Sequence, residues 1–151
     1  MKTEGKMITI LLADDDPDDR QLTRDAFAEN RLVNMLHTVE DGEELMEYLR
    51  RQGRYADQKN VPLPGLILLD LNMPRKDGRE ALKEIKADPE LRRIPIVVLT
   101  TSKAEEDIAK AYALQANCYV TKPVDFQNLM QVVGAIESFW LTVVRLPPAN
   151  K

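Results

Sequence analysis

The sequence predicts an α/β fold of the doubly wound type, in which five parallel strands form one sheet with helices on both faces. Three observations predict it. Short apolar runs recur along the chain and are nearly continuous rather than alternating, which is typical of strands buried on both faces. Segments with apolar residues at helical spacing lie between these runs. Strands and helices therefore alternate, which favours crossover connections and a parallel sheet.

Five segments are the candidate strands, of which the second is the weakest. In chain order they span residues 8–13, 35–39, 66–69, 94–100 and 118–121. Right-handed crossovers leave few possible arrangements of such strands, and we expect the flavodoxin-like order 2-1-3-4-5.

The helices are placed by their caps and by their apolar spacing. The first begins at Pro17, because Asp16 is a favoured N-cap and proline suits the first helical position. The second follows the turn formed by Asp41 and Gly42. The expected helices span 17–29, 43–51, 78–87, 105–115 and 125–144. The longest stretch without a pattern, 52–64, is expected to be a solvated surface loop.

Length and composition limit the kind of protein. The 151 residues suffice for a single domain with a core over about 7–145, a short polar N-terminal tail and a proline-rich C-terminal tail. The net charge of −4 and the lack of a basic tract make nucleic-acid binding unexpected. No apolar run reaches the ~18 residues of a membrane span, and we expect a cytoplasmic protein without membrane association. A lone cysteine, Cys118, and a lone histidine exclude an intramolecular disulfide and a His/Cys zinc cluster.

Polar side chains follow four of the expected strands at their carboxyl ends, where open parallel sheets bind ligands. They are Asp14, Asp15 and Asp16 after the first strand, Asp70 after the third, Thr100 at the end of the fourth and Lys122 after the fifth. Each alone has a simpler explanation, such as a helix N-cap for the acidic run or a solvated charge for the lysine. Together they would form one cleft, because these four strands are neighbours in the expected order.

The chemistry of that cleft points to phosphoryl transfer. Crowded carboxylates repel one another, and a hard divalent cation relieves the repulsion. Mg²⁺ suits such a site, because it takes carboxylate oxygens, waters and phosphate rather than a full protein cage. Asp70 could then act as a nucleophile toward phosphorus and form an aspartyl phosphate. Lys122 would neutralise a phosphoryl oxygen, and Thr100 would donate a hydrogen bond to the product.

The motifs around these residues, LLADDDPDD, LILLDLNMPRKDG, PIVVLTTS and YVTKP, resemble those of bacterial response-regulator receiver domains over about residues 8–144. The resemblance implies that Asp70 is the phosphoacceptor and a metal ligand. It further implies that Asp15 binds the metal directly, that Asp14 does so indirectly and that Asn72 contributes its backbone carbonyl.

The same resemblance implies roles at the last strand. Tyr119 falls at the aromatic switch position, and the peptide bond between Lys122 and Pro123 is expected to be cis. Thr100 is the hydroxyl that follows the phosphoryl group. Thr101 is a departure, because the family usually has a smaller residue there, and it could narrow access to the site.

A receiver domain is a signalling protein that accepts a phosphoryl group from a sensor histidine kinase, rather than an enzyme with its own substrate. The chain resembles the response regulators that partner bacterial phytochromes in three features, namely the 52–64 stretch, the 136–144 segment and the absence of an output domain. A phytochrome-type kinase is therefore the implied partner. Two outputs stay open, a phosphate relay to another histidine and a surface that recruits a partner.

Two other classes of protein fit parts of the pattern. A haloacid-dehalogenase-type phosphohydrolase also uses a strand-end aspartate and Mg²⁺, but it needs a second acid two residues later, where this chain has Asn72. A flavin-binding module needs a phosphate-cradling loop after the first strand, where the acidic run would repel a phosphate.

The last expected helix carries more apolar residues than one face can bury. One stripe comprises Phe126, Leu129, Met130, Val133, Ile136, Trp140 and Val144, and a second line comprises Val132, Phe139 and Val143. We expect a symmetric homodimer through this helix, with Phe139, Trp140 and Val143 as interface candidates. The alternative is that residues 146–148 fold back over the second line.

Overall fold

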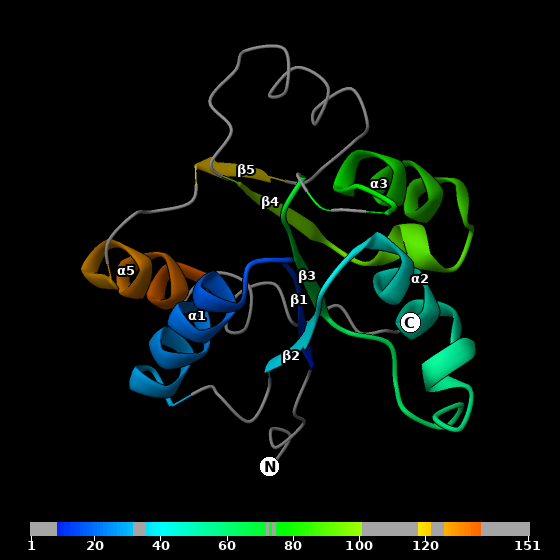
Figure 1. The fold of residues 1–151 in the computed structure, drawn as a ribbon, viewed down its shortest axis with the longest axis horizontal. Coiled ribbons are helices and arrows are strands. Elements are labelled where there is room, and N and C mark those ends of the chain that lie inside the picture. Colours follow the sequence, from blue (N-terminus) through cyan, green and yellow to red (C-terminus); the bar gives the residue numbers. More distant parts are fainter. Residues whose placement is uncertain are drawn as a thin grey trace.

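The computed structural model describes residues 9–31, 36–71, 73, 75–100, 118–121 and 126–136. Five strands form one sheet in the order β2-β1-β3-β4-β5, and every pairing is parallel. The strands are β1 Ile10–Ala13, β2 Leu36–Val39, β3 Leu66–Leu69, β4 Ile96–Thr100 and β5 Cys118–Thr121. The flavodoxin-like fold and its strand order are confirmed (Figure 1).

Helices connect the strands. Those in the described residues are α1 Pro17–Glu29, α2 Gly42–Arg50, α3 Gly78–Ala87, α5 Phe126–Ile136 and the short 3-10 helices η3 Gly53–Tyr55 and η4 Leu91–Arg93. The expected helix over 105–115 lies outside the described residues, as does the last helix beyond Ile136. Among the helices of the described ranges, none combines the length and apolar character that crossing a bilayer requires.

Helix α2 begins at Gly42, one residue earlier than predicted and directly after its N-cap Asp41, and two other bounds shift for local reasons. Helix α2 ends at Arg50, one residue early, because Arg51 adopts a left-handed conformation with φ of 55°. Strand β4 begins at Ile96, two residues late. The Ile94 amide closes η4 by donating to the Leu91 carbonyl at 3.0 Å, and Pro95 has no N–H with which to extend the strand pairing.

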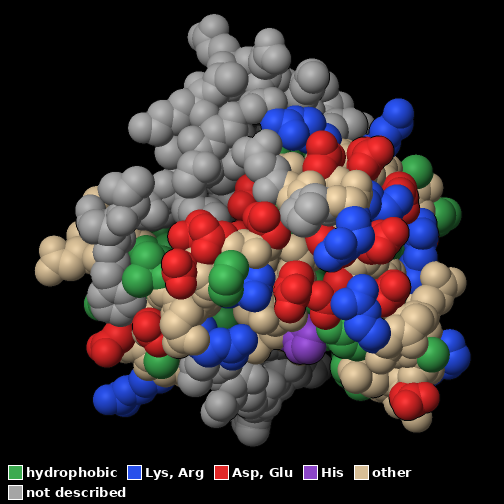
Figure 2. Space-filling view, viewed as in Figure 1, with side chains coloured by type: hydrophobic (Ala, Val, Ile, Leu, Met, Phe, Trp, Pro, Cys, Tyr) green, Lys and Arg blue, Asp and Glu red, His purple; other side chains and the backbone are tan. Residues whose placement is uncertain are grey.

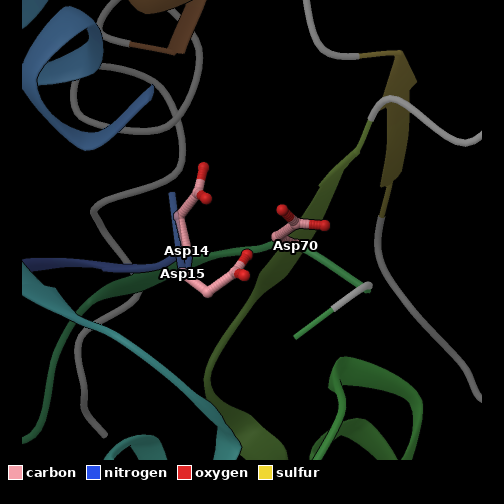
Figure 3. Close-up of side chains that lie close together, drawn as sticks. All are labelled: Asp14, Asp15 and Asp70. Atoms are coloured by element: carbon pink, nitrogen blue, oxygen red, sulfur yellow. The ribbon is translucent and has the colours of Figure 1, made fainter. Parts of the chain in front are cut away.

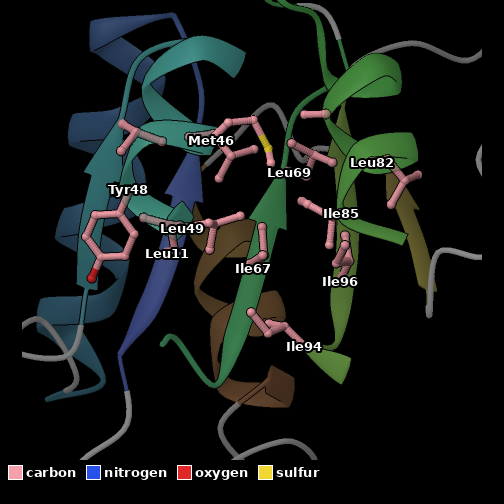
Figure 4. Packing of buried hydrophobic residues seen from close by; sticks show 14 of the residues in the cluster. Leu11, Met46, Tyr48, Leu49, Ile67, Leu69, Leu82, Ile85, Ile94 and Ile96 are labelled. Carbon is pink, nitrogen blue, oxygen red and sulfur yellow. The ribbon is translucent and has the colours of Figure 1, made fainter. Parts of the chain in front are cut away.

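The sheet separates two apolar layers, because successive side chains of a strand point to opposite faces. On one face Leu11, Ile67 and Ile96 pack with residues of α2 and α3 (Figure 4). On the other face Ile10, Leu12, Leu66, Leu68 and Val97 pack with residues of α1 and α5. Both faces are covered, which explains why the strand sequences are continuously apolar.

The stretch 52–64 is mostly exposed, as predicted, but it is anchored to the core at particular residues. It contains η3, and Tyr55 at the end of η3 is buried against the core. Arg51 anchors the stretch, since its guanidinium donates to the carbonyl of Tyr48 at 2.6 Å and to those of Val61 and Pro62 at 2.7 Å each. The same guanidinium lies 4.6 Å from the centroid of the Tyr48 ring. The prediction of a solvated surface loop is therefore confirmed for most of the stretch, where residues 52–54 and 56–62 are exposed, and wrong for Tyr55.

Candidate metal site at the strand ends

Three aspartates meet where β1 and β3 end (Figure 3). Asp14, Asp15 and Asp70 each offer a carboxylate oxygen, and these oxygens all lie within 4.8 Å of one another. Asp14 and Asp70 are buried, with 1% and 8% of their surface exposed, whereas Asp15 is exposed. Carboxylate charges this close repel one another, and a bound cation would relieve that repulsion. Three oxygen donors, one of them reachable from solvent, fit a hard divalent cation.

The sheet itself places two of these side chains together. The parallel ladder continues one residue beyond each strand, since the Asp14 amide donates to the Val39 carbonyl at 3.1 Å and the Asp70 amide to the Ala13 carbonyl at 3.0 Å. Ala13 is the partner of Leu69 in the register of β1 and β3. Asp14 and Asp70 are therefore adjacent because their strands are adjacent and in register.

Asp16, the third acid of the run, serves the helix. Its side chain accepts from the amides of Asp18 at 2.9 Å and Asp19 at 3.4 Å, which makes it the N-cap of α1. Its own amide donates to Asp14 Oδ1 at 3.0 Å, which fixes the orientation of that buried carboxylate. The N-cap explanation is thus correct for Asp16.

Figure 2 shows acidic side chains predominating where α1 begins, and a mixture of both charges around α2 and α3.

The loop after Asp70 is held close to the site by a glycine. A Cβ at Gly78 would contact the Asp70 carbonyl oxygen and lie 2.6 Å from Leu71 Cα, closer than any real Cβ approaches. The Gly78 amide donates to the Leu71 carbonyl at 2.9 Å. The loop between β3 and α3 therefore closes on itself directly beside Asp70, and only glycine permits this approach.

A second contact holds the same loop from the side of α2, and sequence reasoning missed it. Arg75 Nε donates a hydrogen bond to Asp41 Oδ2 at 3.0 Å, and Arg75 Nη2 lies 3.0 Å from the same oxygen. The sequence indicates Asp41 only as part of a turn and predicts no role for Arg75. No sequence signal pairs them, because 34 residues separate the two.

The remaining predicted site residues are described only in part. Thr100 is the last residue of β4 and pairs with Thr121 of β5, so its backbone lies at the same edge of the sheet as Asp70. The side chains of Thr100 and Tyr119 lie outside the described residues. So do Asn72, Thr101, Lys122 and Pro123, together with the interface candidates Phe139, Trp140 and Val143. Their roles stay predictions.

Comparison with known proteins decides the family. Residues 10–134 match the family model of the response regulator receiver domain. The chain belongs to the response regulator receiver domain family. It is 47% identical over 140 residues to the response regulator Rcp1 of a Synechocystis strain, a match that covers 93% of each chain. The match supports neither the phosphohydrolase nor the flavin alternative.

Two solved receiver structures extend the comparison. The crystal structure of the phosphorylated cyanobacterial phytochrome response regulator RcpA has a TM-score of 0.84 at 48% identity, covering 95% of this chain and 99% of that one. The Mn²⁺-bound form of response regulator Rcp1 has a TM-score of 0.82 at 46% identity, covering 93% and 99%. This chain is thus a receiver-domain response regulator whose relatives include phytochrome response regulators.

Proposed function

We propose that this response regulator accepts a phosphoryl group on Asp70 from a sensor histidine kinase of the phytochrome type. The observation that carries the proposal is the group of three carboxylates at the ends of β1 and β3, within 4.8 Å of one another. Asp70 is the member on the central strand β3, and it is largely buried. A relative at 48% identity is described as a phosphorylated phytochrome response regulator, which supports both the modification and the kind of kinase.

The proposed cofactor is Mg²⁺, held by Asp15, Asp70 and the Asn72 carbonyl, with Asp14 in indirect contact. A bound divalent cation supplies neutralisation of the negative charge that builds up between the carboxylates and the phosphoryl oxygens. The oxygen donors of the three aspartates suit such a hard cation. A relative at 46% identity is described in a Mn²⁺-bound form, which supports a divalent site in this fold.

The chain's own groups have distinct tasks in the proposed transfer. An Asp70 oxygen forms the bond to phosphorus while the bond from phosphorus to the kinase's histidine nitrogen breaks. Lys122 neutralises one phosphoryl oxygen, and the Thr100 hydroxyl donates a hydrogen bond to another. Positioning these groups requires the carboxyl ends of β1, β3, β4 and β5 to lie side by side, which the parallel sheet provides. The protein acts in the cytoplasm as a switch and assists its own phosphorylation.

The test is phosphorylation of matched variants. Wild type, Asp70→Asn and Asp16→Asn are incubated with a small phosphodonor, with and without Mg²⁺, and acid-labile phosphate is counted. Asp16→Asn is the control, because asparagine preserves the cap of α1 beside the site. Wild type and the control should be labelled only with Mg²⁺, and Asp70→Asn should stay unlabelled. Undiminished labelling of Asp70→Asn would overturn the assignment.

The kinase is tested separately. Candidate sensor histidine kinases, phytochrome-type and others, are incubated with the protein and radiolabelled ATP, and the transfer rates are compared. A phytochrome-type kinase should transfer fastest. A faster transfer from a kinase of another type would contradict that part of the proposal while leaving Asp70 in place.

We also propose that the protein forms a symmetric homodimer through α5. Val132 on α5 is only half-buried, although it packs beside the core. Phe139 and Val143 continue the same line at spacings of seven and four residues, and Trp140 is the other aromatic candidate. Analytical ultracentrifugation compares wild type with a Phe139→Asp, Val143→Asp double variant at micromolar concentration. Wild type should sediment as a dimer and the variant as a monomer. A monomeric wild type, phosphorylated or not, would exclude the interface.

A further inference from the structure

The loop between Asp70 and α3 is confined from two directions. Gly78 holds its end against the Asp70 carbonyl, as described above. From the other side, the first residue of α2 packs on its backbone, since a Cβ at Gly42 would contact the Lys76 carbonyl oxygen and lie 2.7 Å from the carbonyl carbon. The start of α2 is therefore packed directly against the backbone of this loop.

Asp41, the N-cap of α2, also bonds to a side chain of the loop. Asp41 Oδ1 accepts from the Glu44 amide at 2.8 Å and caps α2, while Oδ2 lies 3.0 Å from both Nε and Nη2 of Arg75. The Asp41 side chain is only 3% exposed, whereas that of Arg75 is 59% exposed. Burial alone would raise the pKa of Asp41, but the Glu44 amide and the Arg75 guanidinium outweigh it and hold the pKa below its usual range. The Asp41 carboxylate is thus charged, and each of its two oxygens accepts a hydrogen bond.

Arg75 is held in an unfavourable backbone conformation. Its φ of 62° lies in the left-handed region, which costs a non-glycine residue roughly 1–2 kcal/mol. Such strain persists where the surroundings fix it, and it is enriched near functional sites. The guanidinium that bonds to Asp41 thus belongs to the residue whose backbone is strained. Two residues before Arg75, Met73 is buried in the core.

We propose that Asp41 and Arg75 are positioning residues that fix the loop after Asp70 and thereby set the affinity of the site for a divalent cation. The inference rests on the proposed function, because it assumes that Asp70 and this loop hold the cation. Neither residue touches the three carboxylates in the described contacts. They act through the loop backbone, which runs from Leu71 to Asp77 between the phosphoacceptor and α3.

The experiment is a double-variant cycle with Mg²⁺ affinity as its first readout. Asp41→Asn keeps the cap of α2 and removes the charge, and Arg75→Met keeps the length of the side chain and removes its charge. Arg50→Met is the matched control, because it breaks another ion pair of α2, that with Glu84 at 3.3 Å, and leaves in place the ion pair that Lys76 of the loop makes with Glu84. Mg²⁺ dissociation constants are measured by NMR titration, following the Gly78 amide.

Each single variant should weaken Mg²⁺ binding by about 2- to 5-fold, the range of one partly exposed ion pair. The double variant should be no weaker than either single one, and Arg75→Lys should recover part of the loss. The pKa of the Asp41 carboxyl should rise in Arg75→Met, a change that general destabilisation would not produce. Arg50→Met should bind as wild type does.

Several outcomes would overturn the inference. The first is that both single variants bind Mg²⁺ with wild-type affinity. The second is that the losses of Mg²⁺ affinity add up in the double variant. The third is that Arg50→Met loses as much Mg²⁺ affinity as the two single variants do. Failure of the proposed function looks different, because wild type itself would then bind no Mg²⁺ and take no phosphate on Asp70. The two ideas are therefore separated by the behaviour of the wild-type protein.

Discussion

The Tyr55 hydroxyl donates a 2.6 Å hydrogen bond to the Glu44 carboxylate, and this contact fastens η3 to α2. His37 of β2 joins the pair, with its Nε2 3.2 Å from the tyrosine oxygen and its ring stacked on Tyr48 at 4.7 Å between centroids. Because the single Tyr55 proton is directed to Glu44, the contact with His37 requires that Nε2 be the donor. The neutral His37 ring therefore carries its proton on Nε2.

Replacing Tyr55 with Phe should lower the free energy of unfolding by about 1.5–3 kcal/mol, since it removes a buried hydrogen bond to a charged acceptor. Urea denaturation measures the change. Tyr48→Phe is the matched control, because this neighbouring ring is also buried but its hydroxyl has no described hydrogen bond. Equal losses in the two variants would mean that the Tyr55 hydroxyl contributes nothing specific.

Most of the fold could be predicted because its signals are local. Pro17 after the Asp16 cap marks the start of α1, and the apolar residues Ala81, Leu82 and Ile85 at helical spacing mark α3. The helices found there have the predicted bounds. The run at 66–69 is bounded and continuously apolar, so β3 also has its predicted bounds. Such features need no knowledge of distant residues.

The part that failed depends on distant contacts. Tyr55 lies in a polar stretch, and its burial depends on the Tyr48 ring and on Glu44 and His37, which lie 11 and 18 residues away. The meeting of Asp14, Asp15 and Asp70 was predictable because parallel strands end at one edge. The Asp41–Arg75 pair was not, because a charged residue in a loop gives no sign of its partner.

His37 should make stability depend on pH near neutrality. Burial lowers its pKa from the usual 6.5, Arg24 and Arg51 lower it further, and Glu44 opposes them. The unfolded chain therefore binds a proton at a higher pH than the folded one does. The free energy of unfolding should be highest above pH 6.5 and fall as the pH drops from there toward the lower folded pKa.

The measurement is urea denaturation at closely spaced pH values between 5.5 and 7.5, roughly one unit either side of the histidine pKa. His37→Gln is the control, because it removes the chain's only histidine. It should abolish the slope in this window, whatever its effect on stability itself. A wild type that becomes more stable as the pH falls would show that Glu44, rather than burial, governs the pKa.

Thr100→Ala tests the transmission of the signal. The variant should still be phosphorylated on Asp70, because the hydroxyl is expected to contact the product and does not supply the nucleophile. It should bind its partner less well than phosphorylated wild type, because the phosphoryl group then no longer favours the arrangement in which Tyr119 moves inward. Partner binding is compared before and after phosphorylation. Wild-type phosphorylation dependence in the variant would place the coupling elsewhere.

Gly78 offers a test of how closely the loop approaches Asp70. Gly78→Ala should destabilise the protein by about 1–3 kcal/mol, because its Cβ would meet backbone atoms of Asp70 and Leu71 that cannot move aside cheaply. Gly134→Ala on α5 is the matched control. Its Cβ would meet only Asn30 Oδ1, at an ordinary 3.7 Å, and alanine favours a helix over glycine by up to about 1 kcal/mol. The two variants should therefore shift the urea midpoint in opposite directions. A Gly78→Ala variant as stable as wild type would mean that the loop can open without cost, and would remove the argument that it is held against Asp70.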